Sequence, residues 1–446
     1  MAHRRTLPNS FTSSFNIHEV FIDKGDHSAL SAGMISSLSR WALCFMVVEF
    51  DVDIGPDLKL MRPSIKFSEA DFRVICFSAL PERTANEVKA WEYQFHTFRF
   101  ASSTFNIPLY GNVLFSTIPS TTSTRGYIQQ SLLVLSPHCF PRLFSDVISL
   151  ITTSGACQSG QDFITATPQE KVVFLDNAIA NITHWPNPDK RVRLDLPFLG
   201  QIFTVTSGDD SDNGSEDQQE HEKGAQHLED PFGSWQVLLP HLRQPGTILN
   251  FGGLLPTQPL EADLYLIYEH LVLGLPMVVF SLDPHLCSMF ITNCVDLIKP
   301  MVYSKKVYDY VTVHTCPDTF PQGGLYGVTN PLLAKSDGSF LLIDLTTHDN
   351  AYNAPDNRTI TAKPSLSKLL NFRPPQLQLH REGSIHKGTH RRVLTPQKID
   401  LSSDEAIRSH FHRMSRLLND LLSMDPDTAQ PHVPTHLKGL YDKLRS

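Results

Sequence analysis

The chain has 446 residues, more than one ordinary hydrophobic core holds, so two or three domains are expected. Hydrophobic residues make up 41% and charged residues 19%, which suits a globular protein and excludes a wholly disordered one. The formal charge of -8 comes from the segment Gly208 to Asp230, which has nine carboxylates and one lysine; the other residues carry 37 basic and 37 acidic groups. This balance argues against a nucleic-acid-binding protein.

The seven cysteines are scattered through apolar runs and form no C-x-x-C pair. We therefore expect reduced core thiols rather than a zinc ribbon or a thioredoxin-like redox motif. His3-Arg4-Arg5 is followed by polar residues, which is unlike a signal peptide. The apolar runs 41–50 and 271–282 are shorter than the ~20 residues of a membrane span. We expect a cytoplasmic protein whose membrane contact, if any, is peripheral.

Residues 1–37 are polar and lack sustained periodicity, so we expect a disordered tail. The next segment alternates, with Phe50, Val52 and Ile54 on one side, the pattern of a half-buried strand. Further strand-like segments follow at Phe72–Phe77, Tyr93–Phe100, Leu109–Ile118 and Tyr127–Leu135. The connections are too short for helical crossovers, which predicts antiparallel pairing.

Two helices are expected after this sheet. The apolar stripe of the first contains Leu143, Phe144, Val147 and Ile148. The second begins with a capping box of Thr167 and Glu170, with Pro168 at the first helical position. A hairpin of residues 191–196 and 201–206 ends a first domain that spans residues 38–206.

The acidic segment, residues 207–231, has almost no large apolar side chain and is expected to be disordered. A docking tail for a basic partner is the alternative interpretation. Residues 232–345 then alternate helix and strand, which predicts an α/β domain. Its expected elements are a helix from Leu260, a strand at Met277–Phe280, a helix capped by Asp283, and a strand at Tyr310–His314.

Residues 346–446 are interpreted as a linker followed by one strong helix. Ser402 and Glu405 predict a capping box, and the apolar face of the helix contains Ile407, Phe411, Met414, Leu418 and Leu421. Basic residues gather before the helix and away from its apolar face: Arg381, Lys387, Arg391, Arg392, Arg408, Arg413 and Arg416. A solvated surface is the simple interpretation of these charges, and contact with acidic lipid is the alternative.

A search for chemistry finds no P-loop, dinucleotide fingerprint, G-x-S-x-G elbow or H-E-x-x-H motif. Cys287 and Cys294 lie one heptad apart but lack further ligands nearby, which favours core packing over a metal site. Glu49, Asp51 and Asp53 share one predicted strand face and are interpreted as solvated, with a hard-cation site as the alternative. We expect no cofactor, no metal and no bond-making active site.

Several blocks, taken in order, resemble the DENN-domain family, and within it the branch of DENN domain-containing protein 6. In the upstream module these blocks are Val47–Pro56, Asp71–Phe77, Leu80–Glu82 and Arg125–Ser136. In the central module they are Leu271–Val279 and Gly327–Pro331. The resemblance covers residues 40–206 and 232–345 well and the remainder weakly.

The resemblance implies an α/β protein with a longin-like antiparallel sheet and helices, a central α/β lobe, and a helical carboxyl-terminal lobe that is only partial here. It also implies guanine-nucleotide exchange on a Rab GTPase at recycling endosomes. A factor that binds the nucleotide-free GTPase tightly must weaken nucleotide binding by the same factor. A Rab-binding scaffold without exchange activity is the alternative.

For contact with the GTPase, the sequence suggests Tyr308, Asp309 and Tyr310 beside the central strand and Asp283 at a helix start. The simpler interpretation of each is a satisfied loop or cap residue. The sequence identifies neither the Rab nor the oligomeric state.

Overall fold

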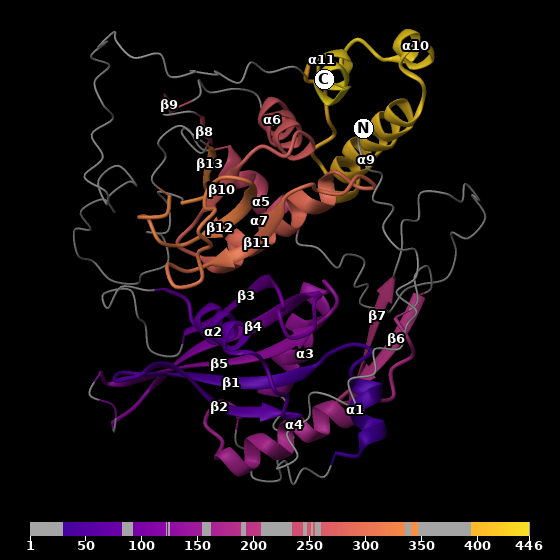
Figure 1. The fold of residues 1–446 in the computed structure, drawn as a ribbon. Coiled ribbons are helices and arrows are strands. Elements are labelled where there is room, and N and C mark those ends of the chain that lie inside the picture. The colour runs from indigo at the N-terminus through magenta and orange to yellow at the C-terminus, as the bar shows by residue number, and fades with distance from the viewer. Residues whose placement is uncertain are drawn as a thin grey trace, which may run out of the picture. The chain divides into compact units, whose positions relative to one another are not determined.

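The chain, described here from a computed structural model, folds into two compact units (Figure 1). Unit 1 comprises Met1–Phe72 and Ala101–Pro231, and unit 2 comprises Arg73–Phe100 and Phe232–Ser446. The structure describes residues 30–82, 92–121, 123, 125–153, 162–188, 193–206, 234–243, 248–250, 253–254, 260–334, 340–346 and 394–445.

A five-stranded sheet has the order β2-β1-β5-β4-β3. Its strands are β1 Cys44–Asp51, β2 Gly55–Arg62, β3 Glu92–Ala101, β4 Pro108–Pro119 and β5 Tyr127–Ser136. The pairs β1–β2, β1–β5 and β4–β5 are antiparallel, which confirms the pairing expected from the short connections. Residues 73–100, which include most of β3, belong to unit 2 by their contacts.

The first strand ends earlier than its alternating pattern predicted. β1 stops at Asp51, whose Oδ1 accepts hydrogen bonds from the backbone N–H groups of Asp53 and Ile54 at 2.8 and 3.2 Å. This turn leads into β2 and leaves Val52 and Ile54 exposed. The prediction that both face a core was wrong because a side-chain-to-backbone turn competes with the strand there.

The segment predicted as a strand at Phe72–Phe77 is a helix, α2 Glu69–Ala79. The buried residues Ile75, Cys76 and Ala79 follow the helical spacing, although the β-branched and aromatic composition favoured a strand. Ser68 begins the helix, since its hydroxyl accepts the N–H of Asp71 at 3.1 Å. Helical periodicity therefore outweighed composition.

Unit 1 also contains α3 Pro141–Thr153 and α4 Pro168–Ile182, with the predicted apolar stripe of α3 buried. The capping box of Thr167 and Glu170 is present at the start of α4, as expected. The hairpin consists of β6 Arg193–Phe198 and β7 Gln201–Thr206. One expectation needs correction, because α1 Ala32–Leu38 lies largely within the predicted disordered tail.

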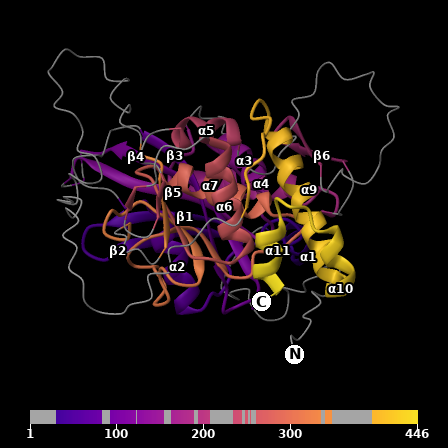
Figure 2. The same ribbon diagram turned by 90° about the horizontal axis from the view of Figure 1, so that it is seen from above.

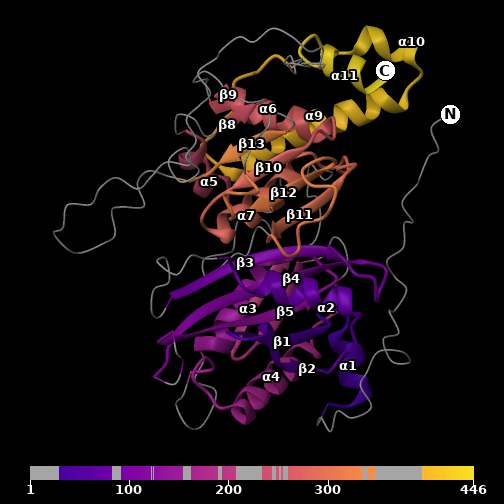
Figure 3. The ribbon, with the colours of Figure 1, turned by 60° about the vertical axis from the view of Figure 1, so that its left-hand side comes forward.

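Unit 2 contains a six-stranded sheet in the order β11-β12-β10-β13-β8-β9, which Figure 3 follows from β9 to β11. Its strands are β8 Ile248–Asn250, β9 Gly253–Leu254, β10 Met277–Phe280, β11 Lys306–Val311, β12 Gly324–Val328 and β13 Leu341–Asp344. Neighbours from β11 to β13 run parallel, and β8 is antiparallel to β13. The strand expected at Tyr310–His314 therefore begins earlier and ends at Val311.

The helices of unit 2 bury apolar faces against this sheet and against one another. They are α5 Trp235–Leu242, α6 Leu260–Val272, α7 Pro284–Leu297, α9 Asp404–Ser423, α10 Pro426–Ala429 and α11 Lys438–Arg445, with a 3-10 turn at Gln430–His432. Figure 2 shows α9 and α11 beside α6. The predicted apolar face of α9 is buried, but Ser403, not Ser402, caps it by accepting the N–H of Ala406 at 3.1 Å.

The described residues form a mixed α/β structure, with a five-stranded antiparallel sheet, a six-stranded mainly parallel sheet and the antiparallel β6–β7 hairpin. The acidic segment at 207–231 and the basic residues Arg381, Lys387, Arg391 and Arg392 lie outside the described residues. Within the described residues, no helix combines the length and apolar character that crossing a membrane requires.

Candidate functional site around strand β11

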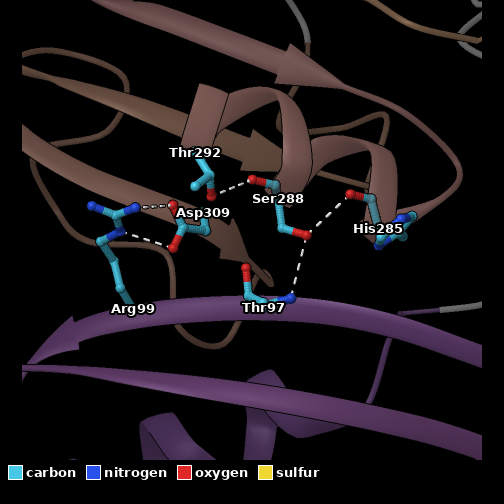
Figure 4. Close-up of polar contacts among 6 residues, drawn as sticks. All are labelled: Thr97, Arg99, His285, Ser288, Thr292 and Asp309. Atoms are coloured by element: carbon cyan, nitrogen blue, oxygen red, sulfur yellow. Dashed lines mark hydrogen bonds and ion pairs between the residues drawn. The ribbon is translucent and has the colours of Figure 1, made fainter. Parts of the chain in front are cut away.

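The carboxylate of Asp309 lies in the interior of unit 2, with a side chain only 1% exposed. It forms a two-pronged ion pair with the guanidinium of Arg99 on β3 (Figure 4). Nε of Arg99 lies 2.8 Å from Oδ2 and NH2 lies 2.7 Å from Oδ1. Burial raises the pKa of Asp309, and Arg99 opposes this shift. A charge-assisted pair of this geometry fixes β11 against β3.

Asp309 and Tyr310 lie in a bulge of β11. Tyr308 pairs with Tyr326 and Val311 with Val328, so β11 uses one residue more than β12 between these positions. Gly327 lies opposite the bulge. A Cβ at Gly327 would be 2.1 Å from the carbonyl oxygen of Asp309, so only glycine allows this close approach.

Tyr310 is also buried, and its hydroxyl accepts the backbone N–H of Glu82 at 3.1 Å. The same hydroxyl is 3.4 Å from Oγ1 of Thr329, and the ring lies edge-on to His96 with centroids 5.2 Å apart. Burial raises the pKa of Tyr310. Its contacts are those of a structural side chain that connects β11 to the segment after α2.

Tyr308 points to a different environment from Tyr310. Its half-buried ring stacks on Tyr326, with centroids 5.0 Å apart and planes 8° apart. Burial, with Tyr326 and Cys316 adding smaller effects, raises the pKa of Tyr308. Of the three predicted β11 residues, Tyr308 is the one that keeps solvent-accessible surface for a partner.

Asp283 is the N-cap of α7, as predicted, and accepts the N–H of His285 at 2.8 Å. Its Oδ1 also accepts Nε2 of Gln94 on β3 at 2.6 Å. One turn further along, Oγ of Ser288 accepts the N–H of Thr97 at 3.2 Å (Figure 4). Helix α7 and strand β3 are therefore joined by side-chain contacts at two successive levels.

The structure thus brings Asp309, Tyr310 and Asp283 into one polar network with β3, and it places Tyr308 beside that network. The network satisfies buried groups inside unit 2. Asp309 and Tyr310 are suited to hold β11 in place rather than to touch a partner directly, because so little of either is exposed.

A second polar cluster was missed by the sequence analysis. Asp296 of α7 is buried, and its carboxylate receives Nζ of Lys299 at 2.8 Å and Nε of Arg408 at 3.0 Å. His412 reaches the backbone carbonyl oxygen of Asp296 at 2.8 Å. The expectation of a solvated Arg408 was wrong, because this ion pair joins α9 to α7. The spacing of Arg408 and His412, one helical turn apart, was the available signal.

Six cysteines lie within the described residues, and the expectation of core thiols is met by four of them, since Cys139 and Cys316 are only partly buried. Cys44, Cys76, Cys287 and Cys294 are buried, and burial raises the pKa of the Cys287 thiol. Within the described residues no group of His, Cys, Asp and Glu side chains is arranged to hold a metal ion. The four buried thiols are packing groups.

No family model matches the chain. The curated "Protein DENND6 homolog" of Dictyostelium discoideum is 24% identical over 311 residues, which are 62% of this chain and 40% of that protein. "Protein DENND6B" of Mus musculus is 24% identical over 327 residues, 67% of this chain and 52% of that protein. "Protein DENND6B" of Homo sapiens is 22% identical over 411 residues, 85% of this chain and 66% of that protein.

The chain therefore spans about half the length of the curated relatives it matches. These relatives all carry the DENND6 name, as do the similar proteins of mouse and chicken named DENND6A. The chain is similar to DENND6 proteins, which supports its sequence resemblance to the DENN-domain family.

Proposed function

We propose that this chain is a guanine-nucleotide exchange factor for a Rab GTPase in endosomal membrane trafficking. The observation that carries the proposal is the similarity to DENND6 proteins over 62 to 85% of the chain. We assign residues 38–206 to a longin-like lobe, residues 232–345 to a central DENN lobe and residues 346–446 to a linker with a partial downstream lobe. The protein is cytoplasmic and is recruited peripherally to recycling endosomes.

Exchange of this kind requires binding energy and no covalent step. The factor binds the nucleotide-free GTPase more tightly than the loaded form, and linkage then weakens nucleotide affinity by the same ratio. An interface of standard size, about 1,200–2,000 Å², supplies such energy. Asp296 and Asp309, the buried carboxylates of α7 and β11, hold elements of unit 2 together, and this role is compatible with a rigid binding surface.

The exposure of the four candidate residues separates those that can touch a GTPase from those that cannot. Tyr308 and Asp283 remain candidates for direct contact because each keeps accessible surface. Asp309 and Tyr310 are positioning residues, since their side chains contact Arg99, Glu82 and Thr329 inside unit 2. A variant that removes Asp309 would disturb β11 itself and so would not isolate a contact with the GTPase.

The test is release of a fluorescent GDP analogue from a panel of purified Rab proteins, with and without the chain at micromolar concentration. Faster release from one Rab supports exchange and identifies the substrate. Binding of nucleotide-free Rab without faster release favours a non-catalytic Rab-binding scaffold. Absence of both effects across the panel contradicts the proposal.

A further inference from the structure

The hairpin of β6 and β7 is a two-stranded sheet in unit 1, and its two outer edges differ (Figure 1). Leu199 and Gly200 form its turn, with φ angles of 46° and 83°. Both residues are in left-handed conformations, as in the two-residue turns whose twist matches that of a hairpin. A two-stranded sheet has little stability of its own and gains stability from packing or from further strands.

The register of the hairpin shows which backbone groups of β7 face outward. The two-residue turn makes Phe198 and Gln201 the first hydrogen-bonded pair, and non-bonded and bonded pairs then alternate. Ile202 and Thr204 therefore lie in non-hydrogen-bonded pairs, and their N–H and C=O groups point away from β6. Within the residues that the structure describes, these four groups have no hydrogen-bond partner.

The outer edge of β6 is protected, whereas that of β7 is not. Pro197 of β6 lies opposite Ile202 and lacks an N–H, and its carbonyl oxygen accepts Nε1 of Trp185 at 2.8 Å. Proline and charged side chains are the usual features by which an edge strand avoids pairing. Asp195 supplies a charge in β6, but β7 contains neither a proline nor a charged residue. A further strand would therefore add to β7.

The side chains of β7 also suit a neighbouring strand. Ile202 is 68% exposed, on the face of the hairpin opposite to the buried Phe203. Most of β7 consists of β-branched and aromatic residues, which form favourable cross-strand contacts. We call the outward backbone groups of Ile202 and Thr204, together with the Ile202 side chain, the β7 edge.

We propose that the β7 edge pairs antiparallel with the β7 edge of a second copy of this chain, so that two hairpins form one four-stranded sheet. Ile202 of each copy lies opposite Thr204 of the other, and a two-fold axis passes beside Phe203. Each Ile202–Thr204 pair exchanges both of its N–H···O=C bonds. The two Ile202 side chains lie diagonally on one face and shield each other from water. Such a dimer does not require exchange activity.

The charge that follows β7 favours this arrangement over a parallel one. The segment from Gly208 to Asp230 carries nine carboxylates and one lysine. In the antiparallel pair the carboxyl ends of the two β7 strands are about 20 Å apart, at about 3.4 Å per residue. This separation exceeds the Debye length of about 8 Å at physiological ionic strength, so repulsion between the two acidic segments is screened. Parallel strands would bring both carboxyl ends together.

A contact between two strands is smaller than a standard interface of about 1,200–2,000 Å², so we expect a weak dimer with a Kd in the micromolar range. Sedimentation velocity of the full chain across the micromolar range measures this Kd. Ile202→Lys removes the apolar contact and adds the charge that protects edge strands, and it should weaken the dimer by about tenfold or more. Far-UV circular dichroism should be unchanged, because the side chain is exposed.

Ile54→Lys is the matched control, because Ile54 is 70% exposed in the same unit, in the turn between β1 and β2. This variant should dimerise as the wild type does. Ile202→Pro tests the backbone bonds, since it removes an outward N–H that β6 does not use. It should weaken the dimer as Ile202→Lys does; if it fails to fold, Ile202→Lys carries the test.

Three results would overturn the proposal. They are a wild-type chain that stays monomeric across the micromolar range, a dimer whose Kd is unchanged in Ile202→Lys, and an equal loss of the dimer in Ile54→Lys. The salt dependence tests the direction of the strands. The Kd of the antiparallel dimer should vary little with added salt, whereas a dimer that tightens steeply would contradict that arrangement.

Discussion

Unit 2 contains two buried carboxylates, Asp309 and Asp296, and they differ in the number of cations that surround them. Asp309 on β11 is paired with one cation, Arg99 of β3. Asp296 on α7 is surrounded by Lys299 from its own helix end and by Arg408 and His412 from α9. Their exposed fractions are similar and close to zero.

The two carboxylates therefore differ in whether a second cation remains when one is removed. Among the described residues Arg99 is the cation that compensates Asp309, so its removal leaves a buried charge unpaired there, whereas Asp296 retains a neighbouring cation after any one loss. We therefore expect the β3–β11 contact to respond to substitution in an all-or-none manner and the α7–α9 contact to weaken in steps.

The largest effect is expected for Arg99→Met. It leaves the Asp309 carboxylate buried and unpaired, which should destabilise unit 2 by about 3–5 kcal/mol at neutral pH. Because burial already raises the pKa of Asp309, the cost should shrink as the pH falls and the carboxyl group takes up a proton. Hydrogen exchange of β11 and α7, followed by mass spectrometry, measures the loss.

The control for this prediction is the double variant Arg99→Met with Asp309→Leu, which removes both charges. It should be less destabilised than the single variant. Equal destabilisation of the two would contradict the view that an unpaired charge causes the loss.

Gly327→Ala tests the bulge opposite Asp309. The new methyl group would meet the carbonyl oxygen of Asp309, which is backbone and has no rotamer to change. We expect a loss near the upper end of the overpacking range, about 3 kcal/mol, measured by urea denaturation. Gly323→Asn, at a left-handed position with open space around its Cβ, is a milder comparison. A Gly327→Ala protein as stable as the wild type would show that β11 can move.

Arg408→Met should cost less than Arg99→Met, about 2 kcal/mol, because Lys299 remains 2.8 Å from Asp296. The loss should appear as faster hydrogen exchange in α9 while β11 exchanges as in the wild type. Arg413→Met, an exposed arginine on the same helix, should leave both regions unchanged. A loss in β11 as large as that in α9 would remove the distinction between the two contacts.

The smallest expected effect is a change in the pH dependence of α9 stability when His410 is replaced. Nε2 of His410 lies 2.8 Å from the hydroxyl of Tyr265. Burial, followed by Arg413 and His436, lowers the pKa of His410. A folded-state pKa below the unfolded value of about 6.5 means that stability is present above that pH and is lost as the pH falls below it. His410→Gln should therefore flatten the decline in α9 stability between pH 7.5 and 5.5.

His138 in unit 1 also has a pKa lowered by burial, so unit 1 is also expected to lose stability as the pH falls. The informative quantity is the difference between wild type and His410→Gln in hydrogen exchange of α9 alone. An identical pH dependence in the two proteins would contradict the prediction.

Patterns that repeat over several turns could be interpreted correctly from the sequence. The stripe of α3, the capping box of α4 and the apolar face of α9 each combine local hydrogen bonding with helical spacing, and all three are confirmed. The failures occurred in short segments. At α2, aromatic and β-branched composition favoured a strand over the helical spacing of Ile75, Cys76 and Ala79, and at Val52 a turn ended the alternation early.

The sequence by itself determined the family resemblance, the mixed α/β class and Asp283 as a helix cap, because these depend on residues close together in the chain. Only the tertiary structure decided the partners of Asp309 and Asp296, since Arg99 and Arg408 are separated from them by 210 and 112 positions. It also decided the bulge of β11 opposite Gly327, which depends on the register between β11 and β12. Burial and register depend on contacts between distant segments, so a local sequence pattern cannot predict them.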